Sequence, residues 1–193
     1  QAKNSGGTPV AELEVETKNK KTVRIAFNFV RDSAGHSTWH VPASVGQWLR
    51  TVNYIYTGQA NIEVLRHSAR SVRVAQNLGR EVRRAAGAAD ERGIVEALGD
   101  NTADMNFFMV WEYESDFIPG TGADRVDASV VGNTCFYENR AGSQTGETIA
   151  HEIGHFLGVS DTYDDNRRHH LMYGYTDVRG IHLSKQDVNA MNP

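Results

Sequence analysis

One stretch near the C-terminus, from His151 to Asp161, restricts the possible folds of this chain more than any other segment. It reads His-Glu-Ile-Gly-His-Phe-Leu-Gly-Val-Ser-Asp. If residues 148–157 form a helix, His151 and His155 lie four residues apart, so both imidazoles leave one helix face about 6 Å apart. Two imidazoles at that separation can bind one metal ion. The fold should therefore contain a helix that ends beside a metal site.

The residues that follow His151 suit the chemistry of such a site. Glu152 points about 100° around the helix from His151, so it can reach a water molecule at the metal without being a ligand, as a general base must. Gly158 has no Cβ and can therefore take a positive φ and turn the chain back at the end of the helix. That turn makes Asp161 available as a third ligand, and Zn²⁺ accepts two imidazoles with one carboxylate.

Simpler explanations exist for each of these residues. A histidine pair with this spacing, such as His151 and His155, also occurs on the surfaces of helices that bind no metal. Asp161 has the residue type of a turn or a cap, and in that case His169 or His170 would supply the third ligand.

Four further features extend the motif. The other face of the helix holds small and apolar residues, Gly158 stands at the break, Asp161 follows three residues later, and Leu171-Met172-Tyr173-Gly174 lies downstream. With these features, residues 147–175 resemble the metzincin clan of zinc endopeptidases, whose members share the extended motif and a methionine-containing turn beneath the metal. Most metzincins have histidine where this chain has Asp161. The aspartate form is similar to the snapalysin family of small bacterial proteases.

The resemblance implies a zinc site made by the three ligands, with Glu152 as the group that takes a proton from water and passes it to the leaving amine. It gives Met172 a structural role beneath the metal. Tyr175 follows shortly after Met172, near the region where the astacin and serralysin branches carry a tyrosine close to the zinc. Tyr175 is thus a candidate to donate to the oxyanion, and the alternative is an aromatic residue buried in the turn. The loop 174–183 should shape the primed-side pocket, as it does in the clan.

Charge is distributed unevenly along the chain, whose formal net charge is −4. Residues 66–92 have a formal net charge of +4, and residues 100–165 have a formal net charge of −11. An acidic region favours a bound cation such as Zn²⁺ and also admits Ca²⁺, for which the aspartates between Asp161 and Asp165 offer oxygen atoms with Asn166. They lack the glycine and distal glutamate of an EF-hand loop. The basic stretch contains no aromatic residue, so we expect a solvated surface and no nucleic-acid partner.

Length and composition favour a soluble monomer with one domain. The 193 residues are 39% hydrophobic and 23% charged, which is typical of globular chains. No apolar run approaches the roughly 20 residues of a membrane helix, so we expect no membrane partner. The single cysteine, Cys135, excludes an intrachain disulfide, and its apolar neighbours place it in the core. Residues 1–9 lack the layout of a signal peptide, so we expect a secreted protein whose leader has been removed.

Hydrophobic periodicity predicts an α+β fold, with a twisted mixed sheet of α/β type, helices above it and a small irregular C-terminal subdomain, as in metzincins. The expected elements are a strand at 22–29, a helix at 43–57 that ends at Gly58, short strands at 62–64 and 72–74, a helix at 90–98, a central strand at 106–113 buried on both faces, an edge strand at 126–130, a strand at 133–138, the metal helix at 148–157, and a last helix capped by Ser184 with Asp187. Residues 80–89 give no clear pattern. We expect an arm at 1–20 and a catalytic domain at 21–193, with subdomains 21–158 and 159–193 on either side of the metal.

We therefore predict a zinc-dependent endopeptidase whose protein or peptide substrate lies extended along the edge strand at 126–130. One alternative is a zinc-dependent hydrolase of a non-peptide amide. The other is a metal-stabilised binding domain without catalysis, against which Glu152 argues because a purely structural site needs no general base. No serine stands in a nucleophile elbow, so a serine hydrolase is disfavoured.

Overall fold

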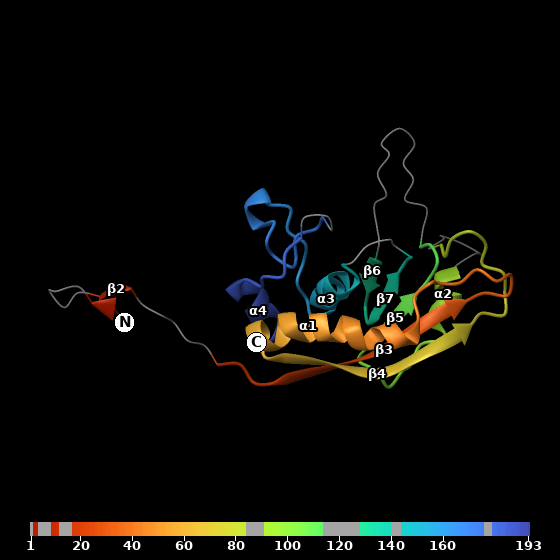
Figure 1. The fold of residues 1–193 in the computed structure, drawn as a ribbon, viewed down its shortest axis with the longest axis horizontal. Coiled ribbons are helices and arrows are strands. Elements are labelled where there is room, and N and C mark those ends of the chain that lie inside the picture. Colours follow the sequence, from red (N-terminus) through yellow and green to blue (C-terminus); the bar gives the residue numbers. More distant parts are fainter. Residues whose placement is uncertain are drawn as a thin grey trace.

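A five-stranded mixed sheet organises the fold (Figure 1). The computed structural model describes residues 2–3, 9–11, 17–83, 91–113, 128–139, 144–175 and 179–193. The elements in chain order are β1 (Ala2–Lys3), β2 (Pro9–Ala11), β3 (Lys21–Arg31), a 3₁₀ turn (Pro42–Ser44), α1 (Val45–Ala60), β4 (Ile62–Arg73), α2 (Glu91–Glu96), β5 (Met105–Met109), β6 (Ala128–Val131), β7 (Thr134–Tyr137), α3 (Thr145–Phe156), a second 3₁₀ turn (Asp165–Arg167) and α4 (Lys185–Met191). β1 and β2 pair with each other, apart from the main sheet.

The strand order of the main sheet is β4-β3-β5-β7-β6. β3 is parallel to both β4 and β5, and β5 is parallel to β7. β6 is antiparallel to β7 and lies at the edge of the sheet. The predicted α+β class with a mixed sheet is confirmed, and so is an edge strand in the region 128–130; residues 126–127 lie outside the described residues.

The two faces of the sheet carry separate cores. One core lies under α1 and α3 and includes Phe107 and Cys135, and the other lies on the opposite face and includes Phe108 and Val95 of α2. β5 is therefore buried on both faces, as predicted, and the core position of Cys135 is confirmed. The strand itself ends at Met109 rather than at Tyr113, because beyond it Tyr113 forms only an isolated bridge with another part of the chain.

α1 ends later than its sequence predicts. Gly58 lies inside the helix, and the helix ends where Asn61 takes the left-handed conformation at φ 51°. Asparagine is one of the few residues with a side chain that adopt this conformation at modest cost. The prediction that Gly58 stops the helix was therefore wrong.

The two short strands expected at 62–64 and 72–74 are one continuous strand, β4. Its pairing with β3 shifts by one residue, since Ile25 pairs with Arg66 whereas Ala26 pairs with Ser68. His67 is the extra residue of this bulge. The bulge and the polar residues around it interrupt the period-2 pattern, which is why the sequence does not reveal a single strand.

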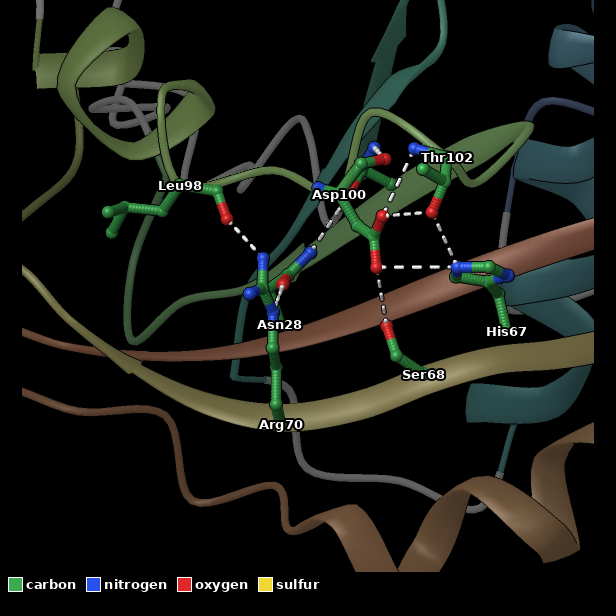
Figure 2. Close-up of polar contacts among 8 residues, drawn as sticks. Asn28, His67, Ser68, Arg70, Leu98, Asp100 and Thr102 are labelled. Carbon is green, nitrogen blue, oxygen red and sulfur yellow. Dashed lines mark hydrogen bonds and ion pairs between the residues drawn. The ribbon is translucent and has the colours of Figure 1, made fainter.

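A polar network on the β5 side fixes this part of β4 (Figure 2). Arg70 Nε donates to Asn28 Oδ1 on β3 (2.9 Å), and His67 Nε2 lies 2.9 Å from Thr102 Oγ1. The carboxylate of Asp100 lies 3.4 Å from both His67 Nε2 and Ser68 Oγ. The network joins the bulge to the loop before β5 and is remote in sequence from the predicted metal motif.

The remaining helices correspond to predicted ones with shifted ends. α2 is shorter than the expected helix at 90–98, and α3 begins earlier than expected. α4 begins with a capping box, in which Ser184 Oγ accepts from Asp187 N and Asp187 Oδ2 accepts from Ser184 N. The predicted cap is confirmed. Across the described ranges, none of the helices has the length and apolar character needed to span a membrane.

Candidate metal centre

α3 carries the two histidines of the sequence motif on one face. The four-residue spacing brings His151 Nε2 and His155 Nε2 to 3.0 Å from each other. His151 is buried and His155 is half-buried. The pair therefore lies at the inner wall of the site rather than on an outer helix surface.

The turn after α3 brings the third residue of the motif to this pair. Gly158 has a φ of +95°, as its position predicts. Asp161 Oδ1 consequently lies 3.1 Å from His151 Nε2 and 3.4 Å from His155 Nε2. Within the part of the chain that the structure describes, these three residues form the one group of three or more His, Cys, Asp or Glu side chains whose ligand atoms lie within 4.8 Å of one another.

The hydrogen bonds of the two imidazoles engage Nδ1 and leave Nε2 of each ring available to a metal. His151 Nδ1 lies 2.8 Å from Leu171 O, and His155 Nδ1 lies 2.8 Å from Val159 O. Because a carbonyl oxygen can only accept, each neutral ring carries its hydrogen on Nδ1 and its lone pair on Nε2. Tetrahedral bonds of about 2.0–2.2 Å to Zn²⁺ separate neighbouring ligands by about 3.3–3.6 Å. The donor types fit Zn²⁺, and the observed separations of 3.0, 3.1 and 3.4 Å lie at or slightly below this range.

Electrostatics keep Asp161 ionised at this position. Burial acts to raise the pKa of the Asp161 carboxyl, but when His151 and His155 are protonated on both ring nitrogens, their hydrogen bonds and positive charges lower it well below its ordinary value. An ionised carboxylate beside two imidazoles is the form that binds a divalent cation.

The segment Leu171–Gly174 holds two of the three candidate ligands in place. Its first carbonyl, Leu171 O, accepts from His151 as described. Thr162 N donates to Met172 O (2.8 Å), and Gly174 N donates to Thr162 O (3.0 Å), so this segment also fixes the chain next to Asp161. The methionine-containing turn of the sequence motif therefore positions candidate ligands through its backbone.

Met172 lies directly beneath α3. It is 1% exposed. A Cβ added to Gly154 would lie 2.4 Å from Met172 Sδ, so only glycine allows the methionine to pack this closely against the helix. This packing holds the turn against the helix that carries both histidines.

Glu152 lines the same cavity as the three candidate ligands. Its side chain is buried, with 5% exposure. Burial raises the pKa of the Glu152 carboxyl, while the charges of His151 and His155 act in the opposite direction, and the net result is a pKa above the ordinary value. A carboxylate with a raised pKa in a cavity is suited to accept and return a proton.

The cavity has a volume of about 610 Å³ and runs beside the edge strand β6. Its wall is formed by residues of β6, α3, the turn after α3 and the C-terminal segment: Ala128, Ser129, Val130, Gly132, Thr148, His151, Glu152, His155, Gly158, Val159, Ser160, Asp161, Tyr163, Gly174 and Arg179. An edge strand along one wall allows an extended peptide to pair with the sheet.

Two tyrosines lie near the ligands, and only one of them lines the cavity. Tyr163 is a lining residue, and its hydroxyl donates to Asp161 Oδ2 (3.3 Å). Its ring covers Gly174, since a Cβ there would lie 2.4 Å from Tyr163 Cε1. Tyr175 is 59% exposed and packs edge-on against Tyr163, with ring centroids 5.4 Å apart. Tyr163 therefore contacts both Tyr175 and the candidate ligand Asp161.

The alternative third ligands lie in a different cluster. The rings of His169 and His170 pack against each other and against His182, with centroid separations of 4.5, 5.1 and 5.7 Å. His170 also faces Asp187 at 3.8 Å. The structure does not bring His169 or His170 to the His151 pair.

The aspartates considered for calcium have other partners. Asp164 Oδ1 accepts from Asn166 N and Nδ2, both at 3.0 Å. Asp165 Oδ1 accepts from Tyr173 Oη (2.8 Å) and pairs with Arg168. These contacts are those of a surface loop, and among the described residues no second group of three or more His, Cys, Asp or Glu side chains brings its ligand atoms together.

Sequence reasoning did not single out Tyr163 or Arg179 of the cavity wall, although Arg179 lies within the loop 174–183 that was expected to shape a substrate pocket. Tyr163 follows Asp161 by two residues, a spacing that places it near the ligand in any extended segment, so a signal was present. Arg179 lies eighteen residues after Asp161 in an irregular segment. No periodicity relates it to the motif, and the expectation for the loop 174–183 does not distinguish it from its neighbours.

Comparison with solved structures identifies similar folds. Metalloproteinase-II from Bacteroides fragilis superimposes with a TM-score of 0.57 at 14% sequence identity, over 95% of this chain and 56% of that one. Archaemetzincin from Methanopyrus kandleri superimposes with a TM-score of 0.53 at 11% identity, over 88% of this chain and 93% of that one. No model of a known protein family and no curated protein matches the sequence. The chain thus has a metalloprotease-like fold and spans about half the length of the Bacteroides protein.

Proposed function

We propose that this protein is a zinc-dependent endopeptidase. The observation that supports the proposal most is the convergence of His151 Nε2, His155 Nε2 and Asp161 Oδ1 beside buried Glu152, in one cavity that runs along an edge strand. The metalloprotease-like fold supports it independently of the motif.

The three ligands would hold Zn²⁺, which supplies Lewis-acid polarisation of a carbonyl group and a lowered pKa for water. Leu171 O and Val159 O orient the two imidazoles, and Thr162 fixes the segment that carries Asp161. This chain thus supplies both the ligands and the groups that orient them.

Glu152 is the general base of the proposed mechanism. Its carboxylate takes a proton from the attacking water and then gives that proton to the leaving amine. Burial favours this role, because it brings the pKa of the carboxyl closer to neutral pH and makes the return of the proton easier.

An extended peptide would bind along β6. Among the described strands β6 pairs with β7 alone, and residues of β6 line the cavity, so its open edge would be able to pair with the substrate backbone. The substrate backbone then lies beside α3, where the reacting carbonyl faces the three ligands and Glu152.

The stabilisation of the oxyanion is assigned to a tyrosine. Tyr175 is the residue suggested by the sequence, and its exposed ring would have to turn toward the cavity to donate. Tyr163 already lines the cavity and is the second candidate. A phenol that donates to a developing oxyanion contributes to turnover rather than to metal binding.

Three narrower predictions belong to the same proposal. The aspartate ligand suggests a snapalysin-like member of the metzincins, and the protein would be secreted and act as a monomer. Division at residues 158–159 into two subdomains would place the cavity at their junction.

Digestion of casein, with and without a zinc chelator, tests the proposal. We expect digestion to stop when the chelator has removed the metal and to return when Zn²⁺ is added. A panel of small non-peptide amides run in parallel distinguishes an amidase from an endopeptidase. Digestion that continues after metal analysis shows the zinc to be gone would refute a zinc-dependent mechanism.

A further inference from the structure

Arg179 adds a positive charge to the wall of the cavity. Among the described residues that line it, Arg179 is the only lysine or arginine. The other ionisable groups of the wall are the two histidines, Glu152 and Asp161, together with the Tyr163 phenol. Neither the sequence motif nor the proposed mechanism gives this arginine a task.

The backbone around Arg179 is fixed by close packing. Gly180 N donates to Arg168 O (3.0 Å), and a Cβ on Gly180 would lie 2.0 Å from His169 O, so only glycine permits this approach of two backbones. Arg179 Nε donates to Tyr173 O (3.1 Å). The guanidinium is therefore anchored to the same turn that positions the metal ligands.

The charge of Arg179 acts on the catalytic groups. The pKa of Glu152 is raised mainly by burial, and the positive charge of Arg179 is one of the influences that oppose this rise. Among the described lining residues, two carboxylates and one guanidinium, together with a bound divalent cation, would sum to a net charge of about +1. Such a site attracts an anionic substrate group and disfavours a cationic one.

The rest of the wall is suited to a polar substrate side chain. Ser129, Thr148 and Ser160 contribute hydroxyl groups, and the aliphatic residues in the described part of the wall are an alanine and two valines. A guanidinium presents several N–H donors in one plane and binds a carboxylate through two parallel hydrogen bonds. A substrate carboxylate matches both the charge and the hydrogen-bonding groups of this wall.

We propose that Arg179 is a specificity-determining residue that binds a carboxylate of the substrate, so that peptides with Glu or Asp close to the scissile bond are the preferred class. This assignment rests on the proposed function, because it requires that a peptide occupies the cavity. It concerns the choice of substrate and leaves the bond-breaking steps to Glu152 and the metal ligands.

Binding to an inactive variant tests the assignment without catalysis. Glu152→Gln protein loaded with Zn²⁺ is titrated with fluorescent alanine-based octapeptides, in which one position at a time holds either Glu or Gln. At one position or more, we expect the Glu peptide to bind about tenfold more tightly than its Gln partner, as is typical of a charge-assisted pair. Adding Arg179→Gln should bring this ratio close to one.

Arg50→Gln is the matched control, because Arg50 is an exposed residue of α1 outside the cavity wall. It should leave the ratio of Glu to Gln binding unchanged. Arg179→Lys retains the charge and should retain a reduced preference. If Arg179→Gln does not fold, the ratio of Glu to Gln peptide binding in the protein with Arg179 still tests the assignment. A ratio of one there overturns it.

Hydrolysis by the unsubstituted protein separates the two proposals. Cleavage of the Gln peptides reports the endopeptidase activity by itself, and the Glu-to-Gln ratio of kcat/KM reports the role of Arg179. Cleavage of neither series would refute the proposed function. Cleavage of both at equal rates, or a Glu preference that survives Arg179→Gln, would refute the role of Arg179 alone.

Discussion

Replacing Gly154 with alanine tests the packing beneath the metal-ligand helix. Gly154 lies between His151 and His155 on α3, and its missing side chain leaves room for Met172. The added Cβ would lie 2.4 Å from Met172 Sδ, 3.0 Å from Met172 Cε and 3.2 Å from Met191 Cε, whereas ordinary contacts begin at 3.4 Å. The methionine sulfur must therefore move by about 1 Å or more for alanine to fit.

The size of the effect follows from two opposing contributions. Overpacking a tight core costs about 1–3 kcal/mol, and exchanging glycine for alanine within a helix contributes about 1 kcal/mol of stability. The expected net loss in the free energy of unfolding is about 0–2 kcal/mol. Displacement of Met172 should also disturb Leu171 O, which orients His151, so zinc affinity should fall as well.

Gly58→Ala provides the control, because Gly58 lies inside α1 and an added Cβ there meets no atom within 4 Å. This variant should gain about 0.5–1 kcal/mol. Urea unfolding of both variants, with a zinc titration of each, measures the difference. If Gly154→Ala gains as much stability as Gly58→Ala and binds zinc normally, the proposed packing of Met172 is wrong.

Three other substitutions test separate parts of the structure. Tyr163→Phe and Tyr175→Phe should separate the two phenols, because the one that assists the oxyanion loses kcat while its zinc content stays constant; unchanged kcat in both variants would exclude either role. Asp32 is buried and, although burial acts to raise its pKa, hydrogen bonds from His36 and Leu78 N lower it below the ordinary value. The stability that the ionised Asp32 contributes is thus present above about pH 3.9, the pKa of aspartate in the unfolded chain, and is lost as the pH falls through the lower pKa of the folded protein. In urea unfolding, Asp32→Asn should therefore cost about 1–3 kcal/mol at pH 7 and progressively less below about pH 4. A stability difference between Asp32→Asn and the unsubstituted protein that does not change with pH would argue against this role. Ser184→Ala should cost about 1 kcal/mol by removing the cap of α4, and no change in thermal unfolding would show that the cap contributes little.

The ligand geometry could be predicted because it depends on local rules. The period of the α-helix fixes the positions of His151 and His155 relative to each other, and a glycine at the helix end is the usual device for reversing the chain. Asp161 then follows within the few residues that the turn allows. These inferences need no knowledge of the rest of the fold.

The errors in the predicted elements arise from interactions between segments. β4 is continuous because it pairs along its length with β3, and the bulge at His67 conceals this in the sequence. α1 passes Gly58 because packing against the sheet outweighs the modest cost of one glycine in a helix. Local signals cannot report these tertiary contributions.

The cavity wall is the least predictable part of the site. Arg179 lies in an irregular segment. This segment is held by the close packing of Gly180 against the backbone of His169 and by one hydrogen bond from Arg179 Nε to Tyr173 O. Such contacts have no sequence period. Tyr163 shows the intermediate case, since its distance from Asp161 in the chain is informative but its orientation over Gly174 is not.

The most direct test of the proposed mechanism compares the unsubstituted protein with Glu152→Gln, measuring zinc content and casein hydrolysis on the same preparations. We expect both proteins to bind one zinc ion per chain, because Glu152 is not among the ligands. Hydrolysis by Glu152→Gln should fall by about 10²–10⁴-fold, the usual contribution of a general base. Equal hydrolysis by the two zinc-loaded proteins, or an unsubstituted chain that binds no zinc, would contradict the mechanism.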